Sequence, residues 1–284
     1  MKIFLIGILI TNISFAWTLN NNFGAVFKDN HVKVYVDDAT ACPTNTLTVQ
    51  ELESLIQPAV DHFWNDIPTS NIHLTAAGYS PNIFTLNHGR LCSPTDDDCI
   101  QQGINEGNVD PTKGLIPAVT DIIIGCNDNG SNFGGGNVLA VTIPNKFSGK
   151  KILGAVILIN DSSSTFGNLS RSDQIGVIAH EIGHALGLGH TPDNASLMYY
   201  RTVNQRKRLG QDDIDGISFL YPIQGDLFGL SEDGLLGSCG TISDLNEPPQ
   251  GNPPFVQMGI TLFVMIFIFK LVRLFNRSKA RAST

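Results

Sequence analysis

The chain has 284 residues, with 18 Lys and Arg, 26 Asp and Glu, and a formal net charge of −8 at pH 7. Residues 17–254 contain all 26 acidic side chains but only 12 of the basic ones, which gives this part a net charge near −14. A surface this negative repels the phosphates of nucleic acids, so we exclude DNA and RNA as partners. The length allows one large domain or two small ones.

The first 16 residues have the layout of a secretory signal peptide. Lys2 precedes the apolar run Ile3–Ile10, and small residues in Ser14–Ala16 mark a cleavage site. We therefore predict a signal peptide at residues 1–16 and export of the mature chain. A buried N-terminal strand is the alternative interpretation.

Apolar residues in the segment 17–222 recur with the periods of strands and helices. Alternating or continuous apolar runs predict strands at His31–Val36, Ile72–Tyr79, Asp121–Cys126, Val138–Ile143 and Ile152–Ile159. Helical spacing predicts helices at Thr46–Trp64, Ser172–Leu186 and Asp212–Leu220. We expect Pro144 to end the fourth strand, Ser172 to cap the second helix, and the stretch between Tyr79 and Asp121 to be irregular. This order predicts a single α/β domain.

The C-terminal part differs in composition. Residues 223–254 are rich in Gly, Pro, Ser and acidic residues and are typical of a stalk. Residues 255–272 form an apolar run of 18 residues, which as a helix would span about 27 Å, just enough for a bilayer core. Residues 273–284 are basic, so the positive-inside rule places them in the cytoplasm. We predict a single transmembrane anchor, with the rest at the cell surface, in the periplasm or outside the cell; a core helix is the alternative.

The five cysteines indicate two disulfides and one remaining thiol. Cys92 and Cys99 bracket a short polar loop and could close it, which leaves Cys42 and Cys126 as the other pair. No C-x-x-C motif supports a thiolate zinc site. Cys239 is the odd cysteine and lies in the predicted stalk.

The segment from His180 to His190 carries the strongest chemical signal. On a helix, His180 and His184 lie on one face and can bind one metal ion, with Glu181 beside the ion but not bound to it. His190 can reach the same ion only if the chain turns back, and Gly187 permits that turn. Three neutral imidazoles leave a fourth zinc position open for water, which is typical of a catalytic site.

This eleven-residue pattern resembles the metzincin metalloproteases. In that superfamily a methionine in a tight turn lies beneath the zinc, and Met198 fits this Met-turn. Within the metzincins, Leu209–Tyr221 resembles the C-terminal helix of the matrixins, and Gly136–Pro144 resembles their edge strand beside the cleft.

The resemblance implies a twisted, mixed five-stranded sheet with three helices, and one catalytic zinc in a cleft between an upper and a smaller lower subdomain. It implies a metalloendopeptidase whose general base is Glu181. The edge strand Val138–Ile143 would bind an extended peptide or protein substrate by backbone hydrogen bonds. We expect the protein to be monomeric.

The chain also departs from the matrixins. No propeptide cysteine precedes the first strand, and the loop Asn127–Asn137 has no histidine for a second, structural zinc. Tyr200 stands where other metzincins place a tyrosine near the zinc, so it is either a transition-state donor or a packed aromatic.

Several alternatives stay open at this point. Asp96–Asp98 and Asp128 could bind Ca²⁺, although they lack the spacing of a known calcium loop and solvated loops are the other interpretation. The domain could be a catalytically inactive zinc-binding surface or adhesion module, or a zinc hydrolase that acts on small amides. The C-terminal part with Cys239 resembles bacterial C-terminal sorting tails, so we weigh processing near Cys239 against a simple membrane anchor.

Overall fold

The computed structural model describes residues 17–20, 24–38, 41–80, 86–92, 96–110, 113–134, 137–201 and 208–223. All of them belong to the first of two compact units of the chain, Met1–Thr241. The signal peptide, most of the stalk, Cys239, the membrane segment and the basic tail lie outside the described residues and stay predictions. Within the described part, no helix is long and apolar enough to cross a membrane.

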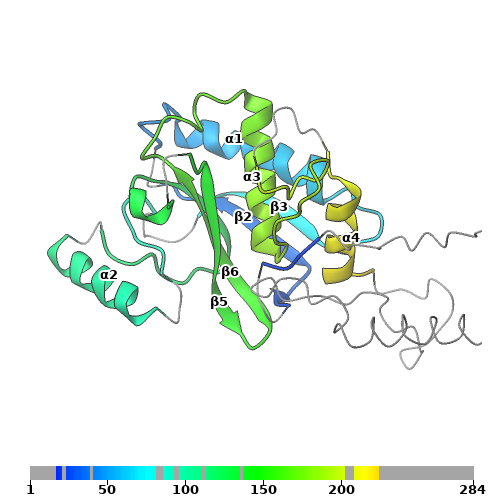
Figure 1. The fold of residues 1–284 in the computed structure, drawn as a ribbon, viewed down its shortest axis with the longest axis horizontal. Helices are drawn as coiled ribbons and strands as arrows, with labels where there is room; N and C mark the ends of the chain where they lie inside the picture. The colour runs from blue at the N-terminus through cyan, green and yellow to red at the C-terminus, as the bar shows by residue number, and fades with distance from the viewer. Residues whose placement is uncertain are drawn as a thin grey trace, which may run out of the picture. The chain divides into compact units, whose positions relative to one another are not determined.

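A mixed sheet organises the described part (Figure 1). Its order is β1-β6-β4-β2-β3, all parallel, and β5 pairs with β6 in antiparallel fashion. The bounds are β1 Val26–Phe27, β2 His31–Val36, β3 His73–Tyr79, β4 Asp121–Asn127, β5 Ala140–Ser148 and β6 Lys151–Asn160. The mixed α/β class is confirmed, but the expected count of five strands is wrong. The strand that was not predicted is β1, which has only two residues, too few to show a periodic pattern in the sequence.

Strand β5 does not end at Pro144 as we expected. It continues to Ser148, and Pro144 is in register with Ala155 of β6. The register shifts immediately after Pro144. Proline is tolerated at sheet edges and bulges because the missing N–H is not needed for pairing there.

Helices α1 and α3 pack together on one face of the sheet (Figure 1). Helix α1 covers Val49–Ala59 and continues as a π-helical turn, Val60–Trp64. It begins later than predicted because Thr48 and Glu51 form a capping box, each side chain accepting from the other's backbone N–H. Trp64 is fully buried between the layers and donates its indole N–H to the carbonyl of Ala179 in α3 at 3.0 Å.

Helix α3 covers Arg171–Leu186, and helix α4 covers Gln211–Leu220. The cap of α3 is Ser170, not Ser172, because the Ser170 side chain accepts from the backbone N–H of Asp173. Ser172 lies inside the first turn. The positions of α3 and α4 otherwise agree with the predicted helices to within one residue.

Helix α2, Asp97–Val109, lies in the stretch that we expected to be irregular. Figure 1 shows it on the side of the β5–β6 hairpin away from α3 and α4. Its only buried residue is Gly103, so the sequence has no apolar stripe from which the helix could be predicted. Asp96 caps its first turn through the backbone N–H of Cys99. A fourth α-helix therefore corrects the predicted count of three.

Both predicted disulfides are present, Cys42–Cys126 and Cys92–Cys99. Cys92–Cys99 links the first turn of α2 to the segment before it. Cys42–Cys126 links the loop before α1 to the end of β4.

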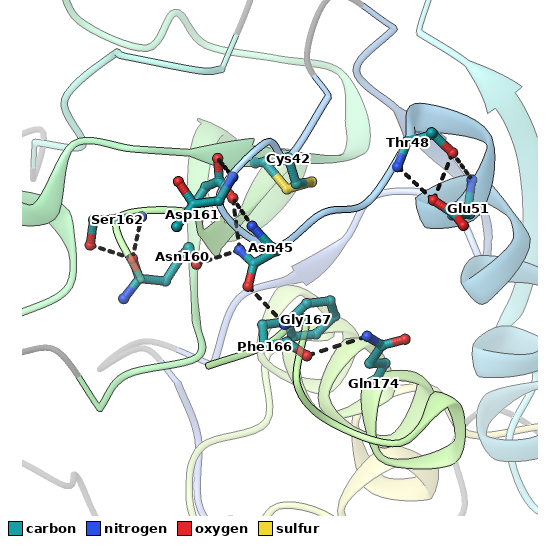
Figure 2. Close-up of a disulfide and its surroundings, with 12 residues drawn as sticks. Cys42, Asn45, Thr48, Glu51, Asn160, Asp161, Ser162, Phe166, Gly167 and Gln174 are labelled. Atoms are coloured by element: carbon teal, nitrogen blue, oxygen red, sulfur yellow. Dashed lines mark hydrogen bonds between the residues drawn. A yellow bond between two sulfur atoms is a disulfide. The ribbon is translucent and has the colours of Figure 1, made fainter. Parts of the chain in front are cut away.

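A buried polar cluster lies beside the Cys42–Cys126 disulfide (Figure 2). Asp161, which follows β6, accepts from the backbone N–H of Asn45 at 2.9 Å and from its side chain at 2.8 Å. Asn45 in turn accepts from the backbone N–H of Gly167 at 2.7 Å. A Cβ atom at Gly167 would collide with the backbone of Asn45, so this approach requires glycine. The cluster fixes the loop that leads from the sheet into α3.

Candidate metal centre and active site

Three histidines predicted as metal ligands converge at the C-terminal end of α3. One nitrogen of each of His180, His184 and His190 lies within 4.8 Å of the other two. The ring centroids of His180 and His184 are 4.7 Å apart, because residues four apart share a helix face. His190 reaches them from beyond the helix, with its ring centroid 4.6 Å from that of His184.

Gly187 reverses the chain between the second and third histidines, as predicted. Its φ of 109° is in the region that favours glycine. The N–H of Leu188 bonds to the carbonyl of Gly183 at 3.0 Å, and the N–H of Gly187 bonds to the carbonyl of His184 at 3.1 Å. These two bonds form a Schellman motif, which ends the helix and turns the chain back toward it.

Backbone carbonyls orient two of the imidazoles. Nδ1 of His180 lies 2.7 Å from the carbonyl oxygen of Leu197, and Nδ1 of His184 lies 2.8 Å from that of Leu188. A carbonyl only accepts, so each Nδ1 carries the proton and each Nε2 has a free lone pair. Nε2 of His184 lies 3.2 Å from Nε2 of His190. Nitrogen lone pairs brought this close can share one cation.

Burial favours the neutral form of His184 and His190, which is the form that binds a metal ion. The pKa of His184 is held well below its usual value, first by burial and then by the charges of His180 and His190. Burial also lowers the pKa of His190. Three imidazoles, two of them oriented by backbone carbonyls, are a donor set that fits zinc.

The segment Trp17–Asn20 straps the turn that delivers His190, and sequence reasoning missed it. Asn20 donates its backbone N–H to Gly187 at 2.8 Å and its side-chain amide to the carbonyl of His184 at 3.0 Å. Gly189 donates its N–H to the carbonyl of Thr18 at 2.7 Å, and the Thr18 hydroxyl donates to the carbonyl of His190. The strap therefore adds hydrogen bonds to carbonyls at the end of α3 and in the turn that follows it.

Met198, the residue that resembles the Met-turn methionine, packs against Gly183 of α3. It is 2 % exposed. A Cβ atom at Gly183 would collide with the Met198 sulfur and would lie 2.9 Å from the ring of Trp64. Gly183, one residue before His184, thus permits the close approach of the turn to the helix.

Asp213 of α4 holds the Met-turn in place. Its buried carboxylate accepts from the backbone N–H groups of Leu197 at 2.5 Å and Met198 at 3.0 Å, and from the Ser196 hydroxyl. It also accepts from the N–H of Gly210 at 2.8 Å. The sequence placed Asp213 in the first turn of a helix, where the helix dipole favours it, but gave no sign of these bonds.

Glu181, the predicted general base, is 7 % exposed. Its side-chain oxygen Oε2 lies 2.6 Å from the hydroxyl of Thr142 in β5. Burial raises the pKa of Glu181, against the opposing effects of the His180 charge and the Thr142 hydrogen bond. The role of Glu181 as the general base stays a prediction.

Tyr200 is 53 % exposed, and its ring contacts Tyr199 and Arg201. Its ring centroid is 4.6 Å from that of Tyr199, and the Arg201 guanidinium carbon lies 5.3 Å from it. Its hydroxyl has no hydrogen-bond partner among the described residues. Its role as a transition-state donor stays a prediction.

Two of the four acidic residues considered for calcium, Asp96 and Asp128, have hydrogen-bond partners within the protein. Asp96 caps α2, Asp97 and Asp98 lie in its first turn, and Asp128 pairs with His88 at 2.7 Å. Within the described ranges, the histidine triad is the only group of three or more side chains that could hold a metal ion.

Comparison with known proteins points to the same segment. Residues 124–222 match the Matrixin family (peptidase M10). Metalloendoproteinase 1 of Glycine max is 48 % identical over 56 residues, which are 19 % of this chain and 18 % of that protein. Stromelysin-2 of Rattus norvegicus is 51 % identical over 49 residues, and Matrix metalloproteinase-27 of Homo sapiens is 52 % identical over 48 residues; both matches cover 16 % of this chain. They cover 10 % and 9 % of those two proteins, so the chain spans less than a fifth of the length of these relatives.

The fold is a mixed α/β fold consistent with that of the matrixins. The matched region contains the whole histidine motif, the Met-turn and α4.

Proposed function

We propose that this chain is a zinc-dependent metalloendopeptidase that cleaves extended peptide segments of extracellular or envelope proteins. One observation carries the proposal: the Nε2 atoms of His184 and His190 lie 3.2 Å apart beside His180, with the buried carboxylate of Glu181 next to them in sequence. His180, His184 and His190 would hold the ion.

When bound, zinc would supply a Lewis acid that polarises the scissile carbonyl and makes water more acidic. Glu181 takes the proton of the attacking water and returns it to the leaving amine. The Leu197 and Leu188 carbonyls keep His180 and His184 in the tautomer that leaves Nε2 free. Asp213 holds the turn at Leu197 and Met198, which carries the carbonyl that orients His180.

Strand β5 is the proposed binding edge for the substrate. It pairs with β6 on one side, and no other strand among the described residues pairs with it. A free edge offers backbone N–H and C=O groups to an extended peptide. Thr142 in this strand contacts Glu181, so the edge runs past the proposed base.

A non-catalytic zinc-binding module is the second candidate. The same histidines would serve it, but a buried carboxylate beside the cluster would have no chemical task there. The division into an upper and a smaller lower subdomain and the membrane anchor also stay predictions.

Turnover of a peptide library by the full chain separates the two candidates. The wild type should cleave peptides, and Glu181→Ala should keep its zinc but lose about 100-fold or more of the rate, because only the base is removed. A wild type that binds zinc without cleaving any peptide would support the non-catalytic module. The cleavage sites would also define the peptide preference.

A further inference from the structure

The hydroxyl of Thr142 forms the only side-chain hydrogen bond to Glu181 among the described residues. Thr142 Oγ1 lies 2.6 Å from Glu181 Oε2 and 3.1 Å from the Glu181 backbone carbonyl. The two residues come from different elements, β5 and α3, and are 39 positions apart in sequence. The contact therefore depends on how the strand packs against the helix.

The alternation of β5 directs this side chain toward α3. Ala140 is buried in the core that contains α1 and α3, whereas Val141 and Ile143 pack against a second cluster that includes Phe133. Side chains two apart in a strand share a face, so Thr142 lies on the α3 face with Ala140. On that face a valine would fit the space, but only a hydroxyl can donate to the carboxylate.

The bond restricts the carboxylate of Glu181 at one oxygen only. Hydrogen bonds to charged groups are short and strong, and the 2.6 Å separation is within this range. No described residue donates to the other oxygen, Oε1. The carboxylate is thus fixed through Oε2, while Oε1 has no competing donor among the described residues.

We propose that Thr142 is a positioning residue for the general base, whose hydroxyl fixes Oε2 of Glu181 and leaves Oε1 to take the proton from water. This inference rests on the proposed function. Because Thr142 belongs to the strand proposed to bind the substrate, the hydrogen bond sets the orientation of the base relative to the bound peptide. Misplacement of a catalytic group by about 1 Å can cost on the order of 100-fold in rate.

The test compares three substitutions in the full chain, using a peptide cleaved by the wild type. Thr142→Val keeps the shape of the side chain but removes the hydroxyl, and Thr142→Ser keeps the hydroxyl. Thr75→Val is the control: it also replaces threonine with valine, but on β3, an edge strand remote from β5 in the sheet order. We expect Thr142→Val to lower kcat about 10-fold or more with KM within about twofold, because the base is misaligned while binding persists. Thr142→Ser should restore most of kcat, and Thr75→Val should behave as the wild type. Zinc content should stay at the wild-type value in all three.

Each other result overturns the inference. An unchanged kcat in Thr142→Val would show that the base needs no such partner. A loss of kcat that serine does not restore, or that accompanies loss of zinc, would show a purely structural role. A wild type that binds zinc but cleaves nothing would contradict the proposed function itself, which separates that failure from the failure of this inference.

Discussion

Asp213 accepts the backbone N–H of Leu197 at 2.5 Å, and the carbonyl of Leu197 accepts a hydrogen bond from His180 at 2.7 Å. A residue of α4 therefore orients a proposed metal ligand of α3 through the backbone of one residue, Leu197. Asp213 is 1 % exposed, and its four hydrogen-bond partners among the described residues are all donors.

Asp213→Asn should destabilise the domain by about 2 kcal/mol or more, because an amide has one acceptor oxygen in place of two and faces N–H groups with its own N–H groups. Asp215→Asn, which changes an exposed residue of the same helix, is the matched control and should have little effect. Urea unfolding of the metal-free chains measures both. Equal unfolding midpoints for the two variants would contradict the role of Asp213.

The turn at Gly187 gives the second prediction. Gly187→Ala should cost about 1–3 kcal/mol, because φ of 109° is strained for a residue with Cβ. It should also weaken metal binding, because the turn delivers His190. Gly149→Ala, in the turn between β5 and β6, places a Cβ at φ of 57° with no atom within 4 Å. This control should lose some stability but keep its metal affinity, as measured by competition with a chromophoric chelator.

The strap predicts a further effect on metal retention. Asn20→Ala removes the side-chain bond to the His184 backbone carbonyl, which should loosen the turn that delivers His190 and speed zinc release. Asn168→Ala, an exposed residue of the loop before α3, is the control and should release metal at the wild-type rate. Zinc release to a chelator in stopped flow measures both variants. Identical release rates would leave the strap without a role in metal binding.

The two disulfides should stabilise the domain unequally. Cys42 and Cys126 are 84 positions apart, and Cys92 and Cys99 are 7 apart. In the chain-entropy account, the longer loop contributes about 4–5 kcal/mol and the shorter about 2–3 kcal/mol. Paired Cys→Ser variants compared by urea unfolding would show this order, and a larger loss from the Cys92–Cys99 pair would contradict it.

The parts of the fold that the sequence predicted are those with strong apolar periods. Strand β6 and helix α3 carry long apolar runs or stripes, and both were placed to within a residue or two. Helix α2 has no apolar stripe, and β1 has only two residues, so neither element could be predicted from apolar periodicity. Pro144 misled the prediction of β5, because edge pairing tolerates a proline that a central strand would exclude.

The residues of the candidate site also fall into those that local sequence patterns predict and those that they do not. The spacing of His180, His184 and His190 predicted their convergence because it depends only on helix geometry and one glycine. Thr142 and Asp213 reach the site through tertiary packing of β5 and α4, which no local pattern records. The strap at Trp17–Asn20 was missed for the same reason.

Zinc content of the purified full chain, compared between wild type and His184→Ala, tests the central claim most directly. The three imidazoles should hold one tightly bound zinc, and removal of a buried ligand should release it. His31→Ala, at an exposed histidine on β2, should retain the metal and controls for histidine loss alone. One zinc per chain in wild type and His31→Ala, with little or none in His184→Ala, is the predicted result. No zinc in the wild type, or full retention in His184→Ala, would contradict the account.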